Sequence, residues 1–300
     1  MKRVAIIGAI LAVAPFTFAQ GGGTQSQNPP TGQQGAPAQP STPAPAQAPA
    51  KHPPQAKTQP EFDAFKAASA NTDPAAVEKA ADDFAAKFPD SELRVILYKT
   101  AMRGFQNANN ADKMLEMARK TLAIDPDDPE ALVDQAEVLT ERTRDTDLDK
   151  DQRLDEARKS GERALQTIDT DIVFPAGTPP EKVDEYKNLL RSSVYSILGT
   201  LEFNKNNFTV AETDFHKSID AYPQQPDPVT VLRLSLALDR QNKYPEALTY
   251  ANKAVDLTQD GSAAHTLAVR ERDRLVQLTG GKPAAPAAGT TPPQNTTVPH

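Results

Sequence analysis

The chain has 300 residues, no cysteine and a net charge of −7. Residues 61–279 hold all 40 Asp and Glu residues but only 28 of the 33 Lys and Arg residues, so this part alone carries a net charge of −12. An acidic surface disfavours binding to nucleic acids and to anionic lipids, and the lack of thiols excludes disulfides, thiolate metal sites and cysteine nucleophiles.

Residues 1–19 have the features of a secretory signal peptide. Lys2 and Arg3 precede a short apolar run, and Thr17 and Ala19 supply the small residues that signal peptidase requires. We therefore expect an exported protein, periplasmic or secreted, that is cleaved after Ala19. The alternative is an uncleaved membrane anchor, although the run is short for a membrane span.

Two proline-rich segments flank the rest of the chain. Residues 20–60 contain ten prolines and residues 280–300 contain five, and neither segment contains an acidic residue. Such segments have too little apolar surface to offset the entropy lost on ordering. We predict a disordered N-terminal linker and a disordered C-terminal tail.

The sequence between them is typical of helices. Apolar residues recur at helical spacing, and Asp73-Pro74 and Tyr244-Pro245 each place proline at the start of a helix. Thr178 and Glu181 have the spacing of a capping box, which predicts another helix start. Residues 61–279 are therefore expected to be all-α.

A repeat is visible inside this helical region. The segment LGTLEFNKNNFTVAETDFHKSIDAYP (198–223) aligns with LSLALDRQNKYPEALTYANKAVDLTQ (234–259) at a shift of 36 residues. The matched pairs are Leu198 with Leu234, Phe208 with Tyr244, Ala211 with Ala247, and Ser218 with Ala254. Small residues where two helices cross, together with an aromatic residue near the turn, are typical of stacked helix hairpins.

This pattern resembles the tetratricopeptide repeat. The first unit has the family's residue types at Tyr195, Leu198, Gly199, Phe208, Ala211, Phe215, Ser218 and Pro223. The resemblance covers most of residues 61–279. It implies a solenoid of about four to five helix hairpins, closed by a capping helix at residues 263–278. A unit that begins at Pro129 carries nine extra residues, which form an insertion loop at about residues 143–152.

The resemblance also implies a concave groove lined by the first helix of each hairpin. The residues that it assigns to partner binding are Lys99, Arg103, Gln106, Glu137, Thr200, Phe203, Leu232 and Leu236. We expect this groove to be basic at Lys99 and Arg103 and apolar at Leu232 and Leu236. The apolar end is either open or covered, by the C-terminal helix or by an extended segment at residues 171–190.

The insertion raises a second hypothesis, a calcium site. Asp145, Asp147, Asp149 and Glu156 match positions 1, 3, 5 and 12 of an EF-hand loop, but Lys150 stands where that loop requires glycine. The competing interpretation is a plain insertion loop in which Asp149 or Asp151 caps the next helix.

No motif of catalysis or of cofactor binding is found. The sequence lacks a phosphate-binding glycine loop, a G-x-S-x-G elbow and an H-E-x-x-H motif, and its four histidines are scattered. We predict an exported, non-catalytic adaptor or assembly factor of the bacterial cell envelope, which binds proteins or extended peptide segments in its groove without a cofactor. The alternatives are a calcium-binding module and a structural spacer between envelope layers.

Overall fold

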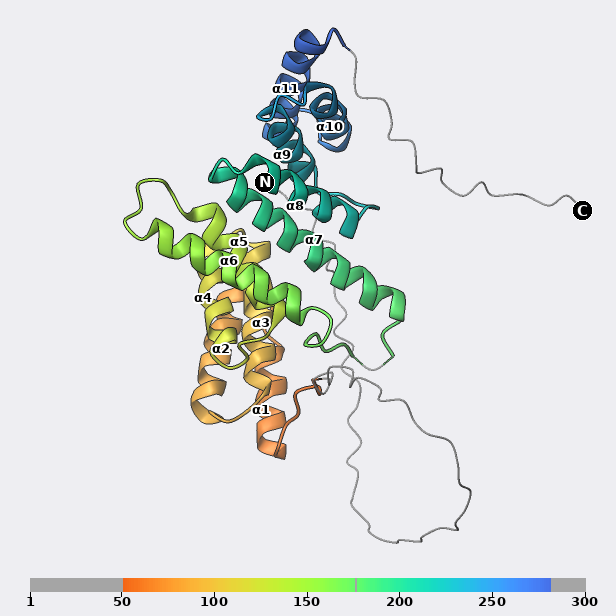
Figure 1. Cartoon of the computed structure of the whole chain (residues 1–300). Helices are drawn as coiled ribbons and strands as arrows, with labels where there is room; N and C mark the ends of the chain where they lie inside the picture. The colour runs from red at the N-terminus through yellow and green to blue at the C-terminus, as the bar shows by residue number, and fades with distance from the viewer. Residues whose placement is uncertain (1–50, 176, 282–300) are drawn as a thin grey trace, which may run out of the picture. The chain divides into compact units, whose positions relative to one another are not determined.

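The computed structural model describes residues 51–175 and 177–281, and apart from Lys51 these residues belong to one compact unit that begins at His52. This part of the chain contains eleven α-helices and no β-strand, which confirms the predicted all-α class (Figure 1). The helices are α1 (Gln59–Ser69), α2 (Pro74–Lys87), α3 (Leu93–Asn107), α4 (Ala111–Leu122), α5 (Pro129–Arg142), α6 (Lys150–Thr167), α7 (Pro180–Asn204), α8 (Phe208–Ala221), α9 (Pro228–Asp239), α10 (Tyr244–Leu257) and α11 (Ala263–Thr279). The predicted signal peptide, and most of the predicted linker and tail, lie outside the described residues.

The first ten helices form five hairpins, each packed on the next. α1 pairs with α2, and the same holds for α3 with α4, α5 with α6, α7 with α8 and α9 with α10. The second helix of each hairpin also packs on the first helix of the following hairpin, and α11 packs on α10 and α9. Contacts are thus made between neighbours along the chain, which is the defining property of a solenoid. The expected array of hairpins and its final helix are both present.

Aspartates cap three of the helices. Asp73, Asp128 and Asp227 accept hydrogen bonds at 2.8–2.9 Å from the backbone N–H groups of Ala76, Ala131 and Thr230, and a proline follows each aspartate. The capping box predicted at Thr178 is not formed. The Thr178 hydroxyl donates to the carbonyl of Pro175 at 2.7 Å, so it is used in the preceding turn, and α7 begins without a side-chain cap.

Three hairpins share one turn geometry. Asn109, Asn206 and Asn242 each follow the first helix of a hairpin with a positive φ of 54–62°. Asparagine tolerates this left-handed conformation better than most residues. In each turn the next residue donates its N–H to a carbonyl five positions earlier, at 2.9–3.0 Å. The α5–α6 hairpin differs because the insertion replaces this turn with a longer loop over residues 143–149.

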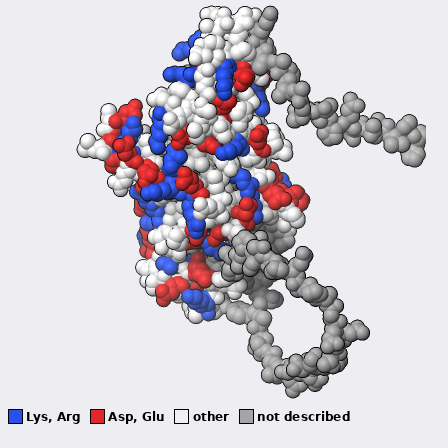
Figure 2. Space-filling view, viewed as in Figure 1, with Lys and Arg blue, Asp and Glu red and all other residues white. Residues whose placement is uncertain are grey.

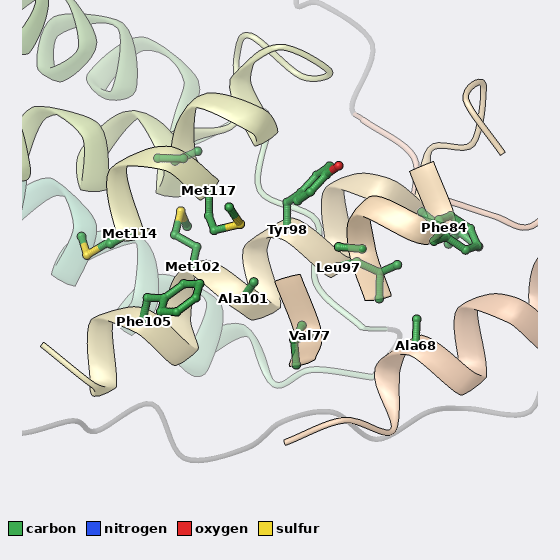
Figure 3. Close-up of a cluster of buried hydrophobic side chains, with 14 of the residues drawn as sticks. Ala68, Val77, Phe84, Leu97, Tyr98, Ala101, Met102, Phe105, Met114 and Met117 are labelled. Carbon is green, nitrogen blue, oxygen red and sulfur yellow. The ribbon is translucent and has the colours of Figure 1, made fainter. Parts of the chain in front are cut away.

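The core is divided into three clusters that follow the hairpins. Figure 3 shows the first cluster, in which Leu97, Met102 and Phe105 of α3 lie among side chains of α1, α2 and α4. A second cluster joins α5 and α6 to α7, and a third joins α8, α9, α10 and α11. No helix in the described ranges is both long enough and apolar enough to cross a membrane.

Gly199 shows why a small residue is needed where the helices of one hairpin cross. A Cβ atom at this position of α7 would lie 2.7 Å from two carbons of the Phe215 ring in α8. Phe215 is fully buried, so its ring has no space into which it could move. Gly161, in α6, is a useful contrast, because a Cβ atom there would meet Leu198 at an ordinary contact distance of 3.4 Å.

These distances predict opposite effects for two glycine-to-alanine substitutions. Alanine favours a helix over glycine by about 1 kcal/mol, so Gly161→Ala should raise the free energy of unfolding by up to that amount. At Gly199 the overlap should outweigh this gain, because overpacking a core costs about 1–3 kcal/mol. Urea unfolding of the two variants measures both effects. Equal stability of the two variants would show that α7 and α8 do not cross closely at Gly199.

Candidate interaction surface

The first helices of the hairpins (α3, α5, α7 and α9) carry the predicted groove residues, and we call the surface that they form the first-helix face. Its N-terminal part is a cluster of paired charges. The Nζ of Lys99 lies 2.7 Å from Oδ2 of Asp128 and 3.0 Å from Oε2 of Glu130. The Arg103 guanidinium donates to both oxygens of Glu130. Asp128 is the N-cap of α5 and Glu130 lies in its first turn, and these ion pairs join the start of α5 to α3. The expected basic end of the groove is therefore neutralised, because the positive side chains of one hairpin meet the negative side chains of the next.

Two buried carboxylates of α5 have opposite electrostatic environments. Burial alone would raise the pKa of Glu130, but the charges of Lys99 and Arg103 outweigh it and lower that pKa to about 2. Asp134 lies one turn further along α5. Burial raises its pKa well above the usual range, and the negative charges of Glu130 and Glu137 add to the increase.

The extra length of α7 closes this part of the face. α7 has 25 residues, and its N-terminal turns bring Tyr186 beside Arg103 and Glu130, where burial and the charge of Glu130 raise the pKa of the tyrosine. The ring of Phe174 packs edge-on against Tyr186, with centroids 5.8 Å apart. Ile172 and Tyr186 both pack against the core cluster that contains Val133 of α5. The segment at residues 171–190 thus covers α5 instead of the apolar end, and it is helical from Pro180 on.

Tyr186 lies beside Arg103 and Glu130, and the repeat pattern did not identify it. The pattern assigns one register position to each residue of a unit, and Tyr186 lies before the first position of its unit. The only sequence signal was the long stretch between Ile168 and Leu190, which carries two aromatic residues, Phe174 and Tyr186.

The charge cluster predicts opposite pH dependences for two conservative variants. Glu130→Gln should lower the free energy of unfolding at pH 7 by about 3 kcal/mol, because it removes the counter-charge of Arg103 and one of the two carboxylates that pair with Lys99. The lowered pKa of Glu130 stabilises the fold above the unfolded-state pKa of about 4.3, and this stabilisation is lost as the pH falls towards 2. The defect of Glu130→Gln should therefore shrink in acid.

Asp134→Asn should behave in the opposite way. A raised pKa means that the folded chain binds this proton more tightly than the unfolded chain. The resulting stabilisation is complete below the unfolded-state pKa of about 3.9 and is lost as the pH rises through the folded-state pKa. Asp134→Asn should thus be more stable than the original chain at pH 7 and should lose that advantage near pH 3. Urea unfolding at several pH values measures the stability of both variants. If the stability changes of the two variants had the same pH dependence, the opposite pKa shifts of Glu130 and Asp134 would be contradicted.

The other predicted groove residues differ in accessibility. Gln106 is exposed and Glu137 is half-buried. Thr200 is buried and donates its hydroxyl to the carbonyl of Ser196 at 2.7 Å. Phe203 is half-buried and packs edge-on against Phe208, with centroids 5.3 Å apart. Thr200 and Phe203 are therefore engaged in the packing of α7, whereas Gln106 remains accessible.

A pocket remains at the C-terminal end. Its volume is about 280 Å³, and it lies between α9 and α11. The lining residues are Leu232, Leu236, Leu267, Arg270, Glu271 and Arg274. Leu232 is buried, Leu236 is half-buried and Leu267 is 54% exposed, so an apolar floor opens to solvent along α11. The capping helix forms one wall of this pocket and does not fill it. We call it the α9–α11 pocket.

The two arginines of the pocket differ in whether they form ion pairs. Arg274 pairs with Asp239 of α9 and with Glu271 of its own helix. Arg270 is exposed and forms no hydrogen bond or ion pair with another described residue. The pocket thus offers an apolar contact beside one available positive charge.

The predicted calcium ligands have other partners. Asp145 accepts from Lys150 at 2.7 Å, Glu156 pairs with Arg119 at 3.1 Å, and Asp147 accepts from the backbone N–H of Arg144 at 2.9 Å. Asp149 occupies the N-cap position of α6 but forms no capping hydrogen bond, contrary to expectation. Within residues 51–175 and 177–281, no three acidic or histidine side chains gather as metal ligands would.

Comparisons with known proteins add little to this geometry. No protein-family model matches the sequence, and a search of curated proteins found no match. A crystal structure of the APC/C hetero-tetramer Cut9-Hcn1 is similar over 73% of this chain and 46% of that chain, with 13% identity and a TM-score of 0.34. The assembly chaperone of RpL4 (Acl4, residues 1–338) is similar over 73% of this chain and 90% of that chain, with 12% identity and a TM-score of 0.29. The chain spans less than half the length of the first, and neither likeness is close enough to bear on function.

The class of the protein follows from its own geometry. Five stacked hairpins, the glycine–aromatic crossing at Gly199 and Phe215, and the recurring asparagine turns define an all-α array of helix-hairpin repeats, the architecture that the sequence resemblance implied.

Proposed function

We propose that the protein is a non-catalytic scaffold that binds a segment of a partner protein at the α9–α11 pocket. The observation that carries the proposal is the accessibility of the first-helix face. Its N-terminal part is closed by paired charges and by the start of α7, whereas the α9–α11 pocket is apolar and open. Open apolar surface on a soluble repeat array is typical of a binding site.

The lining of the pocket indicates the chemistry of the segment that it binds. Leu232, Leu236 and Leu267 favour an apolar side chain, and the exposed Arg270 favours an acidic neighbour of that side chain. Charged residues at the rim of an interface mainly guide association and select partners, while the buried apolar contact supplies affinity. The bound segment should therefore carry an apolar residue flanked by Asp or Glu.

A site-specific photocrosslinker tests the pocket in cells of the native source. Placed at Leu267, it should capture a partner, and mass spectrometry should locate the crosslink on an acidic segment with an apolar residue. A crosslinker at Leu257 of α10, which is also an exposed leucine but lies outside the pocket, is the matched control. Leu236→Ser should reduce capture at Leu267, because it removes part of the apolar floor. A structural spacer without a binding site would show the same captured proteins at both positions.

The proposed setting is the bacterial cell envelope. The order of charged, apolar and small residues in positions 1–19 supports export, and the proline-rich segment that follows would separate the array from that signal. Intact-mass measurement of the protein from the exported fraction should give a chain that begins at Gln20. A mass that still includes residues 1–19 would indicate a retained anchor.

A further inference from the structure

The α5–α6 loop presents a fully exposed leucine. The loop covers residues 143–149, and Leu148 has a relative exposure of 106%. Such exposure of a large apolar side chain has no benefit for folding. In Figure 1 the loop projects from the array at the left of the view.

The loop is held in a defined shape. Asp147 accepts from the N–H of Arg144 at 2.9 Å and donates its own N–H to the Arg144 carbonyl at 3.1 Å. Arg153 of α6 donates to the Thr143 hydroxyl at 3.0 Å, which holds the start of the loop on the helix that follows. Because these bonds are already formed, Leu148 can enter a binding site at a low cost in conformational entropy.

Acidic side chains surround Leu148. Asp145, Asp147, Asp149 and Asp151 lie within four residues of it, against Arg144 and Lys150. Figure 2 shows red side chains gathered on the projection at the left, which corresponds to this loop in Figure 1. The loop thus combines one apolar side chain with a surplus of negative charge.

The α9–α11 pocket has the complementary chemistry. Its floor is made by leucines, and Arg270 at its rim has no ion-pair partner among the described residues. The loop belongs to the third hairpin, and α7 and α8 lie between that hairpin and α9 along the array. The chain thus carries an exposed leucine flanked by aspartates at one place and an apolar pocket flanked by an exposed arginine at another.

We propose that the α5–α6 loop of one copy inserts Leu148 into the α9–α11 pocket of a second copy. The inference rests on the proposed function in one respect, that the pocket is a binding site. The contact is heterologous, because the loop of each copy meets the pocket of another. Each copy keeps a free loop or a free pocket after the first contact, so the copies add head to tail and form rings or open chains.

Sedimentation velocity of the full exported chain tests the proposal. The average mass should rise with protein concentration and fall with added salt, because salt screens the attraction between Arg270 and the aspartates. Leu148→Ser should weaken association by roughly 10-fold or more, since it removes the buried apolar side chain. Val210→Ser, which alters another exposed apolar residue at 50% exposure, should associate like the unaltered chain.

A mixing experiment separates this contact from any symmetric one. Leu148→Ser lacks the loop contact but retains the pocket, whereas Leu267→Ser with Arg270→Glu lacks the pocket but retains the loop. Each variant alone should remain monomeric, and the two mixed should form a one-to-one dimer that does not grow. Both altered pocket residues are exposed, so helicity by circular dichroism should match that of the unaltered chain.

Several results would overturn the proposal. These are a monomeric unaltered chain at every concentration, unchanged association of Leu148→Ser, or a mixture of the two variants that stays monomeric. Should the pocket variant unfold, a synthetic peptide of residues 143–152 replaces it. That peptide should dissociate the oligomers, its Leu148→Ser form should not, and failure of the first peptide would contradict the contact.

The experiments distinguish failure of the head-to-tail contact from failure of the proposed function. If the chain is monomeric and the crosslinker at Leu267 captures a different protein, the head-to-tail contact is rejected and the proposed scaffold function is supported. Crosslinks from Leu267 only to residues 143–152 of another copy would support the contact and leave the scaffold without an external partner.

Discussion

The structure depends on how closely the two helices of a hairpin approach each other. At Gly199 the backbone of α7 meets the buried ring of Phe215, and no side chain fits between them. That approach sets the spacing of α7 and α8. Close packing of neighbouring helices requires small side chains elsewhere in the array as well. Ala211, Ala247 and Ala254 are such residues, and all three are fully buried.

The sequence predicted the parts of the fold that depend on local spacing. The helix start at Pro74, the match between residues 198–223 and 234–259, and the final helix were all read from short sequence patterns, and the structure contains the helices that they predict. The sequence also predicted a helix start at Thr178–Glu181, and α7 begins at Pro180, although the predicted capping bond is not formed. It did not predict what the first turns of α7 cover, because Tyr186 packs beside residues of α3 and α5 that lie about 50 to 90 residues earlier in the chain.

The same limit applies to the predicted groove. Register positions identify which side chains face one side of the array, but they do not show which of those side chains neutralise each other. Lys99 and Arg103 lie on α3, and their charges are neutralised by Asp128 and Glu130 of the next hairpin. Leu232 and Leu236 instead line an open pocket. No further hairpin follows α9 and α10 in the described chain, and α11 covers these leucines only in part.

The long α7 helix also affects how the array can come apart. Repeat arrays without long-range contacts lose their hairpins one at a time from either end. Here α7 packs on α5 and α6 before it and on α8 and α9 after it, so one rigid element spans three consecutive hairpins. Separating the third hairpin from the fourth would expose two faces of that helix at once. Under mechanical load the array therefore has a stiff middle, whereas α1 and α2 at the N-terminal end are held through the first core cluster, which they share with α3 and α4.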